Sequence, residues 1–297
     1  MTPPDPEFLT TRELAALLRV KERKIYELAA TGEVPCRKVT GKLLFPREEV
    51  EAWLAGAGPQ TRAARPPRPN VVVGSHDPLL EWALRESGSG LAAFLDGSLD
   101  GLQRLARGEA IAGGLHLVES DDGTEFNRTH VAEILEGEPV VLLEWAWREQ
   151  GLILPPGNPL GAQTLADLKA RRIMPRQPEA GTYVLLRRLM EQQRLTDSDL
   201  QLLQPPARSQ TDVALAVAAG KADAGIGLAC VARQFKLEFV PLLRERFDLA
   251  VYRRAYFEPA FQRLMRFCAG TAFRTHAEEL GGYDLAGFGT VHYNAPP

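Results

Sequence analysis

Four short polar segments of the chain could hold an anion, because each joins an expected strand to an expected helix. The first turn of a helix leaves backbone N–H groups without partners, and the helix dipole adds partial positive charge there. Hydroxyls, glycines and free N–H groups at such a point make an anion-binding site. The segments are residues 74–78, 96–98, 179–182 and 209–212, although the same residue types also serve as ordinary helix caps.

The spacing within these segments predicts how the helices begin. Asp77 is expected as an N-cap, with Pro78 at the first helical position. Gly101 allows its helix to approach a neighbouring backbone closely. Ser209 and Asp212 have the spacing of a capping box. Two segments fall in each of two α/β blocks, so in a two-lobed protein all four can converge on one cleft at the carboxyl ends of the strands.

The elements that position these segments alternate between strand and helix from residue 70 onward. This alternation predicts an α/β fold with largely parallel sheets. Apolar runs predict strands at 70–74, 91–95, 110–113, 140–145, 152–154, 224–228 and 248–252, and helices at 79–85, 99–107, 183–193, 212–219 and 257–271, with further elements at 165–170 and 173–175.

The first 55 residues have a different pattern. Thr10 and Glu13 form an expected capping box ahead of a helix over Thr11–Leu18, and a second helix is expected over Glu22–Ala30. A tight hairpin follows, with strands at 37–39 and 43–45, and Pro46 is placed in the first turn of a third helix that ends near Leu54. Two short helices with a tight turn and a wing predict a winged helix-turn-helix.

The second helix of a helix-turn-helix enters the major groove of DNA. Here that helix and the wing are rich in basic and polar residues, which can reach bases or phosphates. Residues 1–69 contain twelve Lys and Arg against nine Asp and Glu, so this part is basic while the remainder has a net charge of −6. The expected DNA-binding residues are Lys21, Glu22, Arg23, Lys24 and Tyr26 on the helix and Arg37, Lys38 and Lys42 on the wing, with packing between helix and wing as the alternative for Tyr26.

Residues 56–69, GAGPQTRAARPPRP, lack apolar periodicity and are expected to be a linker stiffened by proline. The predicted domains are therefore 1–55, a DNA-binding domain, and 70–297, a ligand-sensing domain. Three distant cysteines, Cys36, Cys230 and Cys268, indicate reduced thiols and no metal site. The chain has neither a signal peptide nor an apolar run long enough to span a bilayer, so we expect a cytoplasmic protein without membrane contact.

The run LTTRELAALLRVKERKIYELAATGEVPCRKVTGKLLFPREEVEAWL resembles the excisionase-type, MerR-like helix-turn-helix family. The resemblance rests on an apolar helix, an IY-containing second helix, a G-x-x-P turn, a wing and the FPREEVEAWL helix, in that order. It covers about 45 residues. It implies binding to double-stranded DNA, and a head of this size implies at least a homodimer on a two-fold operator.

Residues 70–290 resemble the type II periplasmic-binding-protein fold, in the family related to molybdate- and tungstate-binding proteins. The motifs that carry this resemblance include VVVGSHDPLLEWAL, DGSLDGLQRLARGEAIAGGLHL, PEAGT and TDVALAVAAGKADAGIGL. It implies lobe 1 at about 70–150 and 246–297, lobe 2 at about 151–245, and strands near 142–154 and 239–252 that cross between them. The ligand would lie between the lobes, touched by Ser75, His76, Ser98, His116, Gln177, Ala180, Gly181, Thr182, Thr211 and Asp212.

On this resemblance the ligand is a small anion such as molybdate or tungstate, or a molybdopterin-type cofactor. Hydroxyls of Ser75, Ser98 and Thr182 would hold it together with backbone N–H groups, and His76 and His116 would add hydrogen bonds. No catalytic motif such as G-x-S-x-G, a phosphate loop or a dinucleotide fingerprint is present, so we expect no enzyme. The sequence thus predicts a one-component transcription regulator. The alternative is a cytoplasmic oxyanion- or cofactor-binding or storage protein whose small head contacts other proteins.

Overall fold

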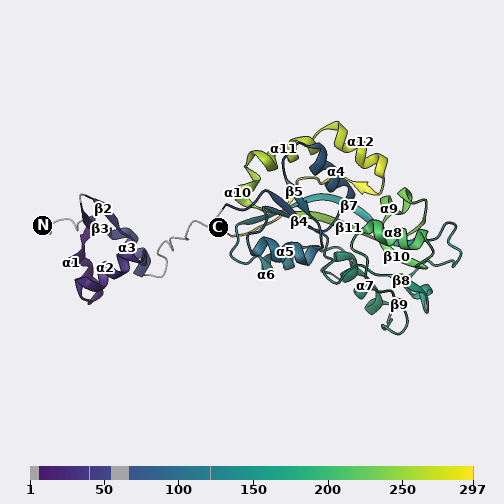
Figure 1. The fold of residues 1–297 in the computed structure, drawn as a ribbon, viewed down its shortest axis with the longest axis horizontal. Helices are drawn as coiled ribbons and strands as arrows, with labels where there is room; N and C mark the ends of the chain where they lie inside the picture. The colour runs from purple at the N-terminus through teal and green to yellow at the C-terminus, as the bar shows by residue number, and fades with distance from the viewer. Residues whose placement is uncertain (1–6, 40, 55–66, 121, 297) are drawn as a thin grey trace. The chain divides into compact units, whose positions relative to one another are not determined.

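The computed structural model describes residues 7–39, 41–54, 67–120 and 122–296. Internal contacts divide the chain into Met1–Pro67, called the head below, and Arg68–Pro297, called the body (Figure 1). The division falls within the predicted linker, of which residues 56–66 lie outside the described residues. None of the helices formed by the described residues has the length and apolar character needed to cross a bilayer.

The head contains three helices and a small sheet. The Thr10–Glu13 capping box is formed as predicted, and the first two helices have the predicted bounds. Leu14, Ile25 and Phe45 are fully buried in the core between helices and sheet. The elements are α1 (Thr11–Leu18), α2 (Glu22–Ala30), α3 (Arg47–Leu54) and an antiparallel sheet in the order β1 (Phe8–Thr10), β3 (Lys42–Pro46), β2 (Arg37–Val39).

Two features of the head differ from the sequence prediction. Residues 8–10 form a strand that pairs with the second strand of the wing, with Phe8 opposite Pro46. Pro46 therefore ends β3 and does not lie in the first turn of α3, which begins at Arg47. Three residues are too few for a recognisable apolar alternation, so this strand depends on its partner.

The body is organised by one ten-stranded sheet whose central strands are long. The strands β7 (Val140–Leu154) and β11 (Glu238–Tyr252) have 15 residues each and pair antiparallel along their lengths. The outer strands are parallel to one another at both ends, so the predicted parallel arrangement holds there and not at the centre. The order is β5 (Ala92–Phe94), β4 (Val71–Gly74), β6 (Ala112–Leu115), β11, β7, β10 (Ala224–Leu228), β8 (Arg172–Met174), β9 (Gln201–Leu202), with β12 (Tyr283–Asp284) and β13 (Val291–Asn294) also on β7.

The two long strands pass through both lobes, which makes them the crossings between lobes. The apolar runs predicted β7 as two strands and only the last part of β11, which was too short. The crossing strands near 142–154 and 239–252 that the resemblance implied are close to the observed bounds. Gly151, near the C-terminal end of β7, allows β11 to approach closely beside the register shift between Pro241 and Leu243, because a Cβ there would lie 2.1 Å from the Val240 carbonyl oxygen.

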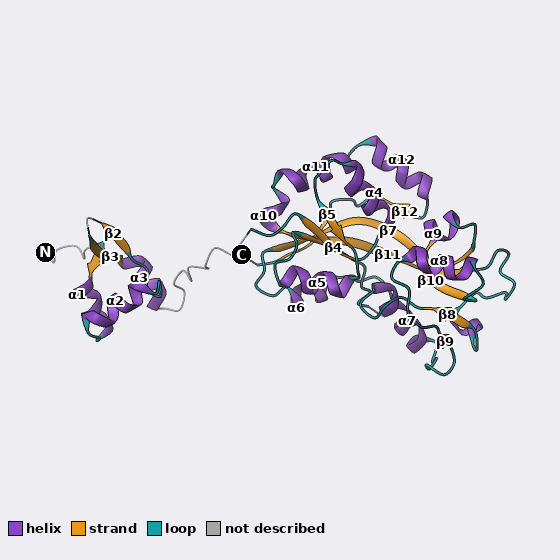
Figure 2. Cartoon of the chain, viewed as in Figure 1, coloured by secondary structure: helices purple, strands orange, loops and turns teal. Residues whose placement is uncertain are grey.

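Helices cover both faces of the sheet in lobe 1. Figure 2 shows α4, α11 and α12 on one face and α5 and α6 on the other, each side with its own apolar core. The predicted helix 257–271 is wrong, because Pro259 begins a new helix and Gly270 is the N-cap of the next. The bounds are α4 (Pro78–Glu86), α5 (Ser98–Ala106), α6 (Arg128–Ile134), α10 (Arg253–Tyr256), α11 (Pro259–Cys268) and α12 (Thr271–Leu280).

Lobe 2 is smaller, and its helices begin next to the cleft. Ser209 and Asp212 form the predicted capping box at the start of α8. Ala180 is the N-cap of α7, which starts two residues before the predicted Tyr183. The helical elements are a 3₁₀ turn at Leu165–Leu168, α7 (Gly181–Gln192), α8 (Gln210–Ala218) and α9 (Ala229–Gln234).

Candidate functional site: the cleft between the lobes

The two lobes touch across the cleft. The Leu99 N–H donates to the Glu179 carbonyl at 3.2 Å, and the Gln177 amide donates to the Asp96 carbonyl at 2.6 Å. A Cβ on Gly97 would lie 2.6 Å from the Glu179 oxygen, so glycine is required for this approach. Arg208 and Asp96 add an ion pair between the lobes. These contacts describe a closed cleft.

A hydrogen-bonded relay runs through the cleft from lobe 1 to β11. The Ser75 hydroxyl lies 2.7 Å from His116 Nε2, and His116 Nδ1 lies 2.9 Å from a Glu245 carboxylate oxygen. All three side chains are buried. Because a carboxylate only accepts, Nδ1 carries the proton and the serine hydroxyl donates to Nε2. The Ser75 oxygen therefore keeps its lone pairs for a donor.

Arg148 on β7 contacts Glu245 of this relay and a second buried carboxylate, that of Asp77. Its guanidinium donates to Asp77 at 2.8 Å and forms an ion pair with Glu245. Asp77 also accepts from the Tyr283 hydroxyl at 2.8 Å, in addition to its predicted capping bond to the Leu80 N–H at 2.7 Å. Both carboxylates are fully buried, so they depend on Arg148 for charge compensation.

Thr182, in the first turn of α7, collects two amides from different elements. Its hydroxyl oxygen accepts from Gln150 of β7 at 3.3 Å and from Gln210 of α8 at 2.9 Å. The amide oxygens of both glutamines are buried and have no hydrogen-bond partner in the part of the chain that the structure describes. This place in the cleft therefore holds acceptors that the protein itself does not satisfy.

Arg176, which follows β8, is buried without a carboxylate partner. Its guanidinium donates only to uncharged oxygens within the described ranges, those of Gln177, Ala207 and Arg208. Burial lowers the pKa of Arg176 to about 10, with Asp212 and Asp96 opposing that shift from a distance. At neutral pH the cleft wall thus holds a positive charge that contacts no carboxylate in the described part of the chain.

The head places its predicted DNA-binding residues at the surface. Lys21 is the N-cap of α2, and the helix residues Glu22, Arg23, Lys24 and Tyr26 are exposed, with Tyr26 53% accessible. The packing alternative for Tyr26 therefore accounts for at most half of its side chain. On the wing Lys38 and Lys42 are exposed, while Arg37 forms an ion pair with Glu49 of α3 at 2.6 Å.

Comparison with protein families decides what these two units are. Residues 80–269 match the family described as PBP superfamily domain. The chain belongs to this PBP family. Residues 8–58 match a second family, described as helix-turn-helix domain. The body and the head thus resemble ligand-binding and DNA-binding domains.

Individual relatives agree with this organisation. The protein YvgK of Bacillus subtilis (strain 168) is 27% identical over 303 residues, covering 95% of this chain and 96% of YvgK. The tungstate ABC transporter structure from Geobacter sulfurreducens matches with a TM-score of 0.50 at 12% identity, over 70% of this chain and 97% of that one. A histidine kinase sensor domain with similarity to periplasmic binding proteins has a TM-score of 0.44 at 15% identity, covering 72% and 96%. At 12% identity, the tungstate transporter structure shows a shared fold only.

Most of the predicted ligand-binding residues of the PBP body come together in the cleft. Ser75, Ser98, His116, Gln177 and Thr182 are buried there. Ala180 and Gly181 are buried at the start of α7, where a Cβ on Gly181 would lie 2.7 Å from the His116 ring.

Three predicted ligand-binding residues take other positions. His76 turns to Glu81, 2.9 Å away on α4. Thr211 is only partly buried, and Asp212 is exposed and closes the α8 capping box. His76 and Asp212 have local partners at the starts of α4 and α8, and for Asp212 this is the ordinary capping role that its spacing also allows.

Five polar residues of the cleft were not predicted from the sequence. Arg148, Gln150 and Glu245 lie on the two long strands, whose charged residues look like breaks in an apolar run. Arg176 and Gln210 each lie next to a predicted residue. All five have long polar side chains next to an expected strand end or helix start. Surface residues have the same property, so the sequence does not distinguish the two.

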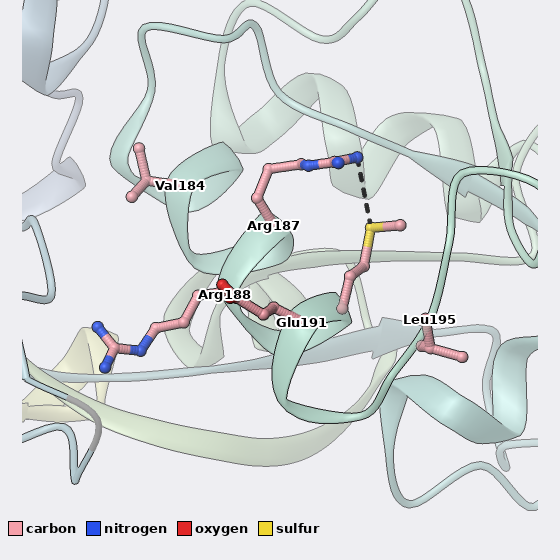
Figure 3. A pocket seen from close by; sticks show the side chains of 6 residues that line it. Val184, Arg187, Arg188, Glu191 and Leu195 are labelled. Carbon is pink, nitrogen blue, oxygen red and sulfur yellow. Dashed lines mark hydrogen bonds between the residues drawn. The ribbon is translucent and has the colours of Figure 1, made fainter.

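A separate hollow lies along α7. Its volume is about 520 Å³, and Figure 3 shows Arg187 and Arg188 extending in opposite directions from the helix at its wall. Arg188 reaches lobe 1 and donates to the Val118 carbonyl at 3.3 Å. None of the predicted ligand-binding residues lines this hollow, so it is distinct from the cleft.

The lowered pKa of Glu245 predicts that the free energy of unfolding of the body falls at acid pH. Although burial opposes ionisation, His116 and Arg148 lower the pKa of Glu245 from 4.5 to about 2. A lowered folded-state pKa contributes stability above the unfolded value, and this is lost as pH falls from about 4.5 through about 2. We expect a loss of about 3 kcal/mol in this window, measured by urea unfolding at fixed pH values.

In Glu245→Gln, the free energy of unfolding should depend less on pH in this window. Glu149→Gln, on the exposed face of β7, is the matched control and should show the wild-type pH dependence. Burial raises the pKa of Asp248 to about 6, so its contribution has the opposite sign and is lost as pH rises from 3.8 through about 6. The comparison is therefore made below pH 3.8. If Glu245→Gln lost as much stability at acid pH as the wild type, Glu245 would not be the cause of that loss.

Proposed function

We propose that this protein is a one-component transcription regulator whose head binds double-stranded DNA and whose body senses a small anionic ligand in the cleft. The observation that carries the proposal is the buried guanidinium of Arg176, which contacts no carboxylate among the described residues. Buried charges are normally paired, because removing an ion from water costs several kcal/mol. A ligand anion beside Arg176 supplies the missing pair.

The first candidates are molybdate, tungstate and a molybdopterin-type cofactor, as the resemblance of the body implies. The tungstate transporter protein of Geobacter sulfurreducens supports the choice of these probes through its fold alone. The Ser98 hydroxyl and the start of α7 at Gly181 and Thr182 lie at the same cleft, where a helix N-terminus favours negative charge.

Ligand binding acts on DNA binding through the two lobes. A ligand that touches both lobes favours the closed arrangement, and it changes DNA affinity only if the two arrangements bind DNA differently. We propose a homodimer, in which closure changes the spacing of two heads on a two-fold operator. The protein would act in the cytoplasm.

The test is DNA binding by the full chain against salt concentration. Fluorescent duplexes selected from a random-sequence pool serve as probes, with and without each anion. Affinity should fall steeply as salt rises, and Arg23→Ala or Lys24→Ala should each reduce the salt slope by about one. Lys221→Ala, an exposed lysine of the body, is the matched control and should leave the slope unchanged.

Anion binding without any salt-dependent DNA binding would instead support the binding or storage protein whose head contacts other proteins. The Ser75–His116–Glu245 relay favours one further candidate, a serine hydrolase, because it has the hydrogen-bond order of an activated nucleophile. Against it, Ser75 is 1% exposed and Glu245 shares its charge with Arg148. Covalent labelling of Ser75 by a fluorophosphonate would favour the hydrolase.

A further inference from the structure

The unsatisfied acceptors of the cleft describe the ligand more closely than its charge does. Gln150 and Gln210 are 0% and 1% exposed, and the amide oxygen of each lacks a partner among the described residues. Both amide nitrogens donate to the Thr182 hydroxyl, so the two side chains converge on one place.

The orientation of the Gln150 amide is fixed by its second contact. Its nitrogen lies 3.0 Å from a carboxylate oxygen of Glu245, which is ionised and can only accept. Turning this amide over would set two oxygens against each other. The oxygen is therefore the atom that is left for a donor from outside the protein.

Gln210 adds a second free acceptor in the orientation that the structure shows. With its nitrogen on Thr182, its oxygen has no partner. Turning the amide over would let the Thr182 hydroxyl donate to the oxygen, but the amide N–H groups would then lose their acceptor. In both orientations one polar atom of Gln210 stays unsatisfied among the described residues, and a buried unsatisfied polar atom destabilises the folded state. The turned amide would need an acceptor, so Gln150, whose orientation Glu245 fixes, carries the need for a donor.

We infer that the ligand of this cleft is an anion that also carries hydrogen-bond donors, such as a hydroxyl, an amine or a ring N–H. Its anionic end pairs with Arg176, and a donor meets the amide oxygen of Gln150, with the Gln210 oxygen beside it in the orientation shown. This inference rests on the proposed anion-sensing function. Sulfate, molybdate and tungstate present only acceptors at neutral pH, so a molybdopterin-type compound fits the cleft better than they do.

The test compares two groups of anions by calorimetric titration of the full-length protein at pH 6. One group only accepts hydrogen bonds: sulfate, molybdate, tungstate and acetate. The other also donates: phosphate, lactate and a molybdopterin-type cofactor. Sulfate and phosphate form the sharpest pair, because both are tetrahedral and only phosphate keeps a proton at this pH. The tightest donor-bearing anion should bind at least tenfold more tightly than the tightest acceptor-only anion.

Variants separate this inference from the proposed function. Gln150→Met should bring the ratio between the two groups close to one while anion binding persists, and Gln210→Met is the second variant should Gln150→Met fail to fold. Without ligand, Gln210→Met should unfold at the wild-type temperature or above it, since it removes an unsatisfied atom. Gln103→Met, on the exposed face of α5, should keep the wild-type ratio.

Two results overturn different claims. An acceptor-only anion that binds as tightly as any donor-bearing one would overturn the inference and leave the anion sensor standing. Failure of every anion in both groups to bind would overturn the proposed anion sensor itself.

Discussion

Replacing Arg148 by methionine should lower the free energy of unfolding of the body by about 3–5 kcal/mol. The guanidinium is 1% exposed and lies between Asp77 and Glu245, neither of which has any exposed surface. Methionine fills much of the same space but leaves two buried carboxylates without a counter-ion. Urea unfolding at pH 7, followed by far-UV circular dichroism, measures the loss.

The matched control is Arg244→Met, four residues before Asp248 on β11. Arg244 forms an ion pair with Asp284, but its side chain is 56% exposed, and water screens the pair. Exposed pairs contribute about 0–1 kcal/mol, so this variant should unfold almost as the wild type does. Equal losses in Arg148→Met and Arg244→Met would show that the buried charges do not depend on Arg148.

The sequence predicted well the features that depend on neighbours in the chain. The helices α1 and α2 have the predicted bounds, and the capping boxes at Thr10 and Ser209 are formed, because a cap involves residues only three apart. The position of Asp77 as an N-cap was likewise predicted, since Pro78 fixes the first turn of α4. Such signals depend on no distant partner.

The centre of the cleft could not be predicted, for a related reason. In β7 the run EWAWREQG interrupts the apolar pattern, which makes one strand look like two. Arg148 and Gln150 are two residues apart and so point to the same face, toward Glu245 on β11. Arg148 and Gln150, which interrupt the apolar pattern of β7, are the residues that contact Glu245 in the cleft. A polar interruption inside a long strand is therefore the signal to examine.

Arg176→Met should have the opposite consequence from Arg148→Met, although the two arginines are buried alike, at 2% and 1% exposure. Among the described residues, no carboxylate would lose its counter-ion when Arg176 is replaced. The substitution removes three hydrogen bonds to neutral oxygens, which destabilises the fold, but it also removes a buried charge, which stabilises it. The free energy of unfolding without ligand should change by less than about 1 kcal/mol. Anion affinity should fall at least 100-fold, which removes about 2.7 kcal/mol of ligand stabilisation. Thermal unfolding with and without the tightest anion measures both. A large loss of unfolding free energy without ligand, together with unchanged stabilisation by the anion, would show that Arg176 has a structural role. The positive charge for the ligand would then come from the helix N-termini alone.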